Sequence, residues 1–190
     1  MADLVLASSS PRRLALLQRL GVEPARIVAP AIDESWRKGE LPHAYALRLA
    51  IAKAEAVMRG PDEVILAGDT AIALGRRILP PADTETVQRD LLAKLSGRRH
   101  HVLSALCVID ATGRMRARLS DTIVAFKQLT PAAIDAYVAS GEGLGKAGGY
   151  AVQGYAEAWV RFLAGSHSGV IGLPLFEARA LLKAAGLSLA

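Results

Sequence analysis

The strongest constraint on the fold is a short apolar segment that leads directly into a serine-rich helix start. Residues 4–7 (LVLA) are uniformly apolar, which predicts a short buried β-strand. Ser10 is a favourable helix N-cap, and Pro11 then occupies the first helical position. The segment SSSPRR at residues 8–13 therefore predicts a corner where a strand turns into a helix, as in a soluble α/β enzyme.

The charges at this corner indicate an anionic ligand. A helix N-terminus carries partial positive charge and free N–H groups, so acidic residues are favoured in its first turn. Here Arg12 and Arg13 occupy that turn instead, next to three serine hydroxyls. The combination suits a di- or triphosphate, although a solvated first turn that happens to contain arginines is an equal alternative on composition alone.

Strand and helix patterns alternate along the rest of the chain. The expected strands are residues 27–32, 64–74, 101–110, 116–126, 150–153 and 159–163, and the expected helices are residues 42–59, 84–96, 130–141 and 174–186. Gly75, Arg76 and Arg77 predict a tight hairpin turn after the second of these strands. With no repeat, linker or low-complexity tail, residues 1–190 are predicted to form a single mixed α/β domain.

The basic balance of the chain favours polyanionic ligands. The formal net charge is +5, but the arginines are spread in pairs and aromatic residues make up only 5% of the chain. Nucleic-acid binders usually cluster their cations and interleave stacking aromatics. A small phosphorylated ligand is therefore the expected partner, and a nucleic-acid-binding module is the alternative that the charge alone favours.

The expected location is the cytoplasm. No apolar run approaches the roughly 18–20 residues that a membrane span needs, and no signal peptide is expected. The single cysteine, Cys107, lies in an apolar run and has no cysteine with which to pair within the chain. A reducing compartment fits this usage.

Lys53 lies on the wrong side of its predicted helix. It is rotated about 140° from the polar direction marked by Arg48, toward the side that should face the core. A buried lysine is costly unless an anion pairs with it. Lys53 is therefore a candidate anion ligand, with a side chain that snorkels to solvent as the alternative.

Asp69 interrupts a segment that otherwise reads as a buried strand. Such interruptions are places where α/β enzymes put catalytic acids, bases and metal ligands. The alternative is an Asx-type turn between two shorter strands. The glycine-rich loop around Lys146 is a weaker signal, since it departs from a Walker A motif at Ser140 and Ala147, but its backbone and lysine could still hold a phosphate.

Several of these segments, taken in order, resemble the Maf family. They are LASSSPRR at residues 6–13, LAIAKA at 49–54, AGDT at 67–70, LSGRRH at 95–100, KAGGYAVQG at 146–154 and VIGLPL at 170–175. The matches span almost the whole chain. The resemblance implies an elongated mixed sheet with helices, as in inosine triphosphate pyrophosphatases, with two lobes around a central cleft.

The resemblance also implies a reaction. Maf proteins are cytosolic nucleoside triphosphate pyrophosphatases, historically linked to septum formation, which release a nucleoside monophosphate and pyrophosphate with the help of a divalent metal, Mg or Mn. Asp69 matches the family's proton acceptor, and Glu34 matches an acidic position expected to hold the metal or a water. The residues that match phosphate-holding positions are Ser8, Arg13, Lys53 and Lys146.

The branch of the family follows from three further matches. Arg12, Thr70 and Gln153 correspond to positions associated with dTTP and UTP, whereas the 7-methyl-GTP branch usually carries an aromatic residue in place of Arg12 and an acidic one near Gln153. Pyrimidine triphosphates, including modified ones, are therefore the expected substrates. A role in removing noncanonical nucleotides and a homodimer are expected from the relatives.

One position departs from the family pattern. Twelve residues after the catalytic aspartate the family normally carries a lysine, and this chain has Pro81. A milder departure is Gly145, where many relatives have aspartate. The lost cation favours a second hypothesis, a nucleotide-binding regulator with weakened turnover, unless Arg76 or Arg77 supplies the charge.

Overall fold

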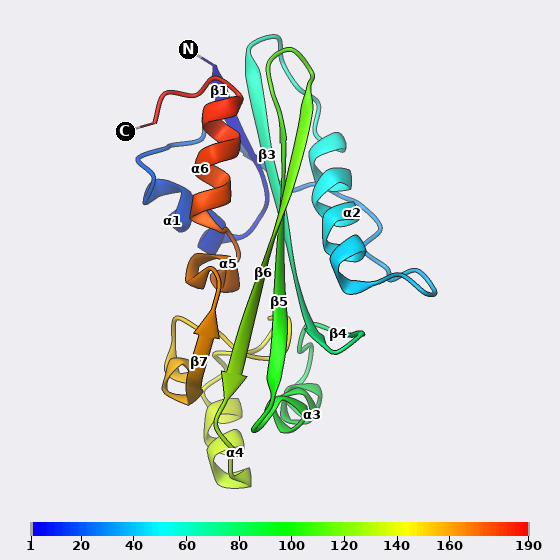
Figure 1. The fold of residues 1–190 in the computed structure, drawn as a ribbon, viewed down its shortest axis with the longest axis vertical. Helices are drawn as coiled ribbons and strands as arrows, with labels where there is room; N and C mark the ends of the chain where they lie inside the picture. The colour runs from blue at the N-terminus through cyan, green and yellow to red at the C-terminus, as the bar shows by residue number, and fades with distance from the viewer. Residues whose placement is uncertain (1, 190) are drawn as a thin grey trace.

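The strands of the computed structural model, which describes residues 2–189, form one continuous mixed sheet of seven strands (Figure 1). The strands are β1 (Asp3–Ala7), β2 (Arg26–Val28), β3 (Glu63–Leu74), β4 (Arg77–Leu79), β5 (Arg99–Ile109), β6 (Met115–Phe126) and β7 (Val160–Ala164). Their order is β2-β1-β3-β5-β6-β7, and β4 pairs with the far end of β3. β2 and β3 run parallel to β1, whereas the other pairs are antiparallel.

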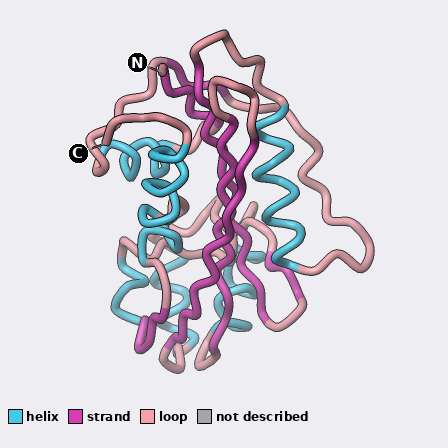
Figure 2. Tube along the Cα trace, turned by 45° about the horizontal axis from the view of Figure 1, so that its top comes forward, coloured by secondary structure: helices cyan, strands magenta, loops and turns pink. Residues whose placement is uncertain are grey.

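The helices lie on both sides of the long strands and at one end of them (Figures 1 and 2). They are α1 (Pro11–Gln18), α2 (Pro42–Glu55), α3 (Glu85–Leu95), α4 (Pro131–Ala139), the 3-10 helix η1 (Tyr155–Trp159), α5 (His167–Ile171) and α6 (Leu175–Ala184). α2 covers one side, while α1, α5 and α6 lie on the other. This elongated mixed sheet confirms the predicted fold class. In the described part of the chain, every helix is too short or too polar to cross a bilayer.

The alternation of side chains along β3 divides the core. Val64 and Leu66 pack with α1 and α6 in one cluster, and Ile72, on the same face but nearer the other end, packs with α3 and α4. Ala67 and Ala71 point to the opposite face, against α2. Gly68 and Thr70 lie on the same face as Val64 and Ile72 but belong to neither of the two core clusters there. The face is therefore not filled by core side chains at these two residues.

Local chemistry accounts for most of the helix starts. Ser10, Thr84 and Thr130 each accept a hydrogen bond from the backbone N–H three residues later, which confirms the three predicted caps. The predicted hairpin also forms, with Gly75 at φ 61° between β3 and β4. β3 is continuous through Asp69, which is aligned with Ala105 of β5, so the turn considered for Asp69 does not form.

Two predicted segments were wrong in extent. The strand expected over residues 27–32 stops at Val28, since Pro30 has no N–H to donate to a neighbouring strand. The helix expected to reach Arg59 ends at Glu55, and the next turn tightens as Val57 N–H bonds to Ala54 O (3.4 Å) and Val57 enters the core.

The strand expected over residues 150–153 is absent. Gly148 and Gly149 both have positive φ, so the chain turns into this segment rather than entering it extended. The amide of Ala151 then donates to the Tyr137 hydroxyl (3.0 Å) instead of to a neighbouring strand. An apolar run therefore became a buried loop.

His100 makes the stability of this fold depend on pH. Its ring is fully buried against Phe126 and Tyr150, and Nε2 lies 2.7 Å from the Tyr150 hydroxyl. Burial lowers the pKa of His100 to about 4. Because the unfolded chain binds this proton at a higher pH, stability is expected to fall by on the order of 3 kcal/mol as pH drops from about 6.5 to about 4.

Urea unfolding of wild type and His100→Gln across this range provides the measurement, with exposed His43→Gln as the control. The loss of stability should be smaller in His100→Gln alone. Equal slopes in all three proteins would contradict the assignment.

Candidate active site

A gap in the pairing of β3 opens the cleft. β1 pairs with β3 only as far as Ala7 and Ala67, and β4 begins to pair at Ile72. Residues 68–71 therefore have no strand on this edge. Ligand sites in α/β sheets lie beyond the carboxyl ends of such strands.

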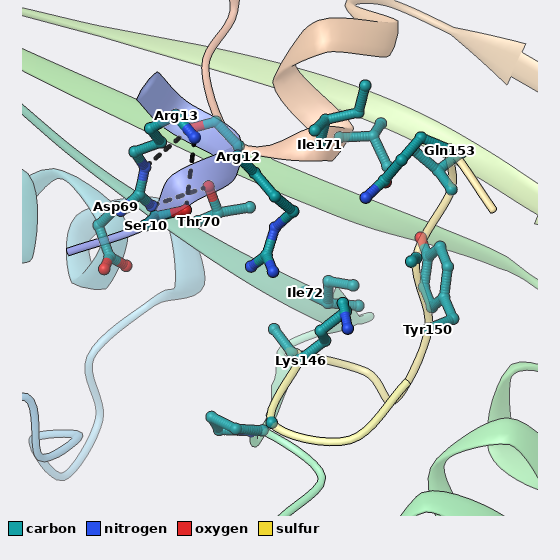
Figure 3. A pocket seen from close by; sticks show the side chains of 17 residues that line it. Ser10, Arg12, Arg13, Asp69, Thr70, Ile72, Lys146, Tyr150, Gln153 and Ile171 are labelled. Carbon is teal, nitrogen blue, oxygen red and sulfur yellow. Dashed lines mark hydrogen bonds between the residues drawn. The ribbon is translucent and has the colours of Figure 1, made fainter. Parts of the chain in front are cut away.

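A cavity of about 190 Å³ lies at this gap. Its lining comes from the β1–α1 corner, β3, the glycine-rich loop and α5, which are far apart in the sequence (Figure 3). Six of the predicted site residues line it: Arg12, Arg13, Asp69, Thr70, Lys146 and Gln153. The other three stand outside the lining: Ser8 contacts Arg13, Lys53 contacts Asp69, and Glu34, among the residues described, reaches the lining only through Lys53.

Arg13 ties three segments of the cavity wall together (Figure 3). Its guanidinium donates to Gly172 O (2.9 Å), to Ser8 Oγ (3.1 Å) and to Thr70 Oγ1 (3.4 Å). Burial lowers the pKa of Arg13, and the nearby Asp69 charge opposes that shift. A side chain in place of Gly68 would put a Cβ 3.5 Å from Arg13 Nε and 3.0 Å from Leu106, so glycine suits this close approach.

Thr70 extends this network into the sheet. Its hydroxyl lies 3.1 Å from Ser104 Oγ, which in turn donates to Gly169 O (2.5 Å). Ser104 was not among the predicted site residues. Its signal was the one that identified Asp69, a polar residue inside an apolar strand. Thr70 therefore holds the wall of the cavity as well as lining it.

Lys53 lies between the two predicted catalytic carboxylates. Its Nζ is 2.7 Å from Asp69 Oδ1 and 2.9 Å from Glu34 Oε1. The Lys53 and Asp69 side chains are only 10% and 9% exposed, whereas that of Glu34 is 53% exposed. The snorkelling alternative for Lys53 is thus wrong, since the ammonium is buried and paired. Asp69 Oδ2 has no hydrogen-bond partner within residues 2–189.

The glycine-rich loop is attached to the segment that carries Pro81. Pro81 and Ala147 form an isolated antiparallel bridge, while Ala82 N–H donates to Lys146 O (3.1 Å) and Gly145 N–H to Ala82 O (2.9 Å). The Lys146 ammonium donates to Glu142 O at the start of this loop. Burial, and then the charge of Arg12, lower the pKa of Lys146. The two cations therefore face the same cavity.

Arg76 and Arg77 do not replace the missing lysine in this geometry. They line a separate groove with Trp36 and Tyr45, and only Pro81 is common to that groove and to the cavity. Tyr150 and Ile171, by contrast, line the cavity and were not among the predicted site residues. Both lie in segments that carry the Maf resemblance, which was the available signal.

Comparisons with known proteins show the family to which the chain is similar. The family model described as Maf-like protein matches residues 3–185. The chain is 65% identical over 190 residues to a dTTP/UTP pyrophosphatase of Sphingopyxis alaskensis, covering 100% of both chains. It is 57% identical over 186 residues to a dTTP/UTP pyrophosphatase of Novosphingobium aromaticivorans, covering 97% of this chain and 92% of the relative.

A solved structure extends the comparison to the fold. A HAM1 protein from Coxiella burnetii superposes with a TM-score of 0.50 at 17% identity, covering 97% of this chain and 100% of that one. At this identity the likeness concerns the fold alone.

The buried ion pair predicts a stability effect. Lys53→Met should destabilise the fold by about 3–5 kcal/mol, because it leaves the Asp69 carboxylate buried without its cation. Lys53→Met/Asp69→Asn should recover part of that loss. Urea unfolding of both, with exposed Lys94→Met as the control, tests this. A Lys53→Met protein as stable as the control would show that the pair is not held in solution.

Proposed function

Since the chain belongs to the Maf family, we propose that it is a nucleoside triphosphate pyrophosphatase acting first on dTTP and UTP. It cleaves between the α- and β-phosphates, so that water adds to the α-phosphorus and pyrophosphate leaves. The observation that carries the proposal is the convergence of Asp69, Lys53 and Glu34 at a cavity that also presents Arg12 and Lys146.

Asp69 is the proposed proton acceptor. One of its oxygens is bound by Lys53, and Oδ2 is available to take a proton from an attacking water. The Lys53 ammonium orients this carboxylate and keeps positive charge beside the phosphate chain. Arg12 and Lys146 supply further positive charge where the leaving pyrophosphate gains negative charge.

Ser8 and Arg13 contribute to phosphate binding by fixing the conformation of the β1–α1 corner. The Arg13 guanidinium makes three hydrogen bonds to protein atoms, and these bonds fix the first turn of α1 beside the cavity. An arginine has five N–H donors in a rigid fork, so donors remain for a phosphate oxygen. Ser8 accepts from both Arg13 and the Ser10 amide, and so helps to hold the corner open.

The proposed cofactor is Mg²⁺ or Mn²⁺. Within residues 2–189 no group of three or more His, Cys, Asp or Glu side chains could enclose a metal ion. Glu34 and Asp69 nonetheless reach the same ammonium, and Mg²⁺ is commonly held by one or two carboxylates together with substrate phosphates. The residues fit that mode, in which the bound cation would neutralise phosphate charge.

Arg12, Thr70 and Gln153 support the choice of pyrimidine nucleotides. All three line the cavity, and relatives with 65% and 57% identity carry the name dTTP/UTP pyrophosphatase. Those names weigh against the weakened regulator that Pro81 suggested. Removal of noncanonical nucleotides in the cytoplasm, by a homodimer, is the setting we propose from the family resemblance.

Asp69→Asn tests the reaction. We expect wild-type protein with Mg²⁺ or Mn²⁺ to release pyrophosphate, not orthophosphate, from UTP and dTTP. In EDTA it should release no pyrophosphate from either nucleotide. Asp69→Asn should lower kcat by roughly 10²–10⁴-fold, the range for loss of a general base. Asp121→Asn, an exposed aspartate paired with His101, is the matched control. Equal rates in wild type and Asp69→Asn would remove Asp69 from the chemistry.

Pro81→Lys tests the departure from the family pattern. Pro81 is exposed at the cavity wall, so a lysine there can reach the phosphates without displacing core side chains. We expect kcat/KM for UTP to rise roughly 10-fold, as for one added charge-stabilising donor. Pro81→Ala, which adds no charge, is the control. Equal kcat/KM in the two variants would show that Arg12 and Lys146 already meet the requirement.

A further inference from the structure

Glu34 is carried by a segment that has no regular secondary structure. Between β2 and α2, residues 29–41 contain only a turn near residues 38–39. The Glu34 side chain is 53% exposed, and within residues 2–189 its carboxylate contacts only Lys53. A catalytic group on a loop needs support from rigid elements to stay in place. The structure contains such a support.

α2 holds the backbone at and next to Glu34. The Tyr45 hydroxyl donates to Glu34 O (3.0 Å), and Arg48 Nη2 donates to Ser35 O (3.0 Å). Both donors come from a helix that packs against β3 and β5.

A partly buried ion pair holds Arg48 in place. Its guanidinium makes a two-point contact with Glu40, at 2.6 Å from Nε to Oε1 and 2.8 Å from Nη2 to Oε2. These side chains are 19% and 10% exposed, whereas the surface pair of Arg89 and Asp135 is 42% and 61% exposed. Two-point arginine–carboxylate pairs have a defined geometry, so the guanidinium is held in one orientation.

Glu40 also accepts hydrogen bonds from residues earlier in its own loop. Its carboxylate accepts from Arg37 N–H (3.2 Å), and its backbone oxygen accepts from Trp36 Nε1 (3.0 Å). Glu40 therefore joins α2 to the loop on the far side of Glu34, while Tyr45 holds the loop at Glu34 itself. The clamp, which we define as Glu40, Tyr45 and Arg48, spans the segment that carries the carboxylate.

We propose that the clamp positions Glu34 for the reaction, so that Tyr45 and Arg48 are positioning residues that act through Glu34. The inference rests on the proposed function, in which Glu34 serves the metal or the attacking water. α2 then supplies both supports of Glu34, since Lys53 contacts its carboxylate and the clamp holds its backbone.

Kinetics in two backgrounds test this dependence. In the wild-type background, Tyr45→Phe should lower kcat for UTP roughly 2–10-fold, as expected for one lost hydrogen bond. Arg48→Ala should lower it roughly 10–100-fold, because small misplacements of reacting groups are costly. In the Glu34→Ala background neither change should lower kcat further, since residues that act as one unit are not additive.

Hydrogen–deuterium exchange of the nucleotide-free protein supplies a readout that does not depend on turnover. Tyr45→Phe and Arg48→Ala should speed exchange in peptides covering residues 33–41, with the rest of the chain unchanged. Arg48→Lys, which keeps the charge but loses the two-point geometry, should behave like Arg48→Ala. Arg89→Ala, an arginine with carboxylate partners on α3 and α4, is the matched control and should change neither exchange there nor kcat.

The outcomes separate this proposal from the proposed function. If wild type releases no pyrophosphate from any triphosphate, the proposed function fails, whatever the exchange data. If wild type is active but Tyr45→Phe and Arg48→Ala cost the same factor with and without Glu34, the clamp does not act through Glu34 and the inference is overturned. Unchanged exchange over residues 33–41 in both variants would overturn it as well.

Discussion

The buried ion pair between Lys53 and Asp69 is the interaction on which the site depends. An ammonium and a carboxylate removed from water are costly unless each has a partner in good geometry. Here they lie 2.7 Å apart, on α2 and β3, and this requires that helix to pack on that face of the sheet. Glu34 joins the pair only because its loop folds back over α2. The arrangement of these three side chains therefore depends on how α2 packs against the sheet.

The same logic divides the two arginines of the first corner. Arg13 donates hydrogen bonds to Ser8, Thr70 and Gly172, and so holds the corner, β3 and the end of α5 together. Arg12 has no such contacts within residues 2–189 and lines the cavity. Arg13 thus holds the cavity wall through contacts with the protein, whereas Arg12 lines the cavity without such contacts in the described part of the chain. This division gives the cavity a firm wall and a cation that is free to meet a ligand.

The sequence predicted those features that depend on neighbouring residues. The caps at Ser10, Thr84 and Thr130, the hairpin at Gly75 and the continuous strand segments follow from local rules. The conflicts with those rules, Lys53 on the core side of a helix and Asp69 inside an apolar strand, fall on two side chains that the structure pairs beside the cavity. The strand predicted over residues 150–153 was wrong, because apolar character alone cannot distinguish a strand from a buried loop that follows two glycines at positive φ.

The sequence by itself determined most of the elements, the family and six of the residues that line the cavity. Only the tertiary structure decided which of these residues touch one another. The unpaired stretch on one edge of β3, between Ala67 and Ile72, exists because β1 stops pairing at Ala67 and β4 starts at Ile72. No local pattern in β3 encodes it. Likewise, Arg48 looks like part of a solvated stripe until Glu40 meets it across a loop. These contacts depend on the relative placement of distant segments, which burial and pairing settle only when the whole chain has folded.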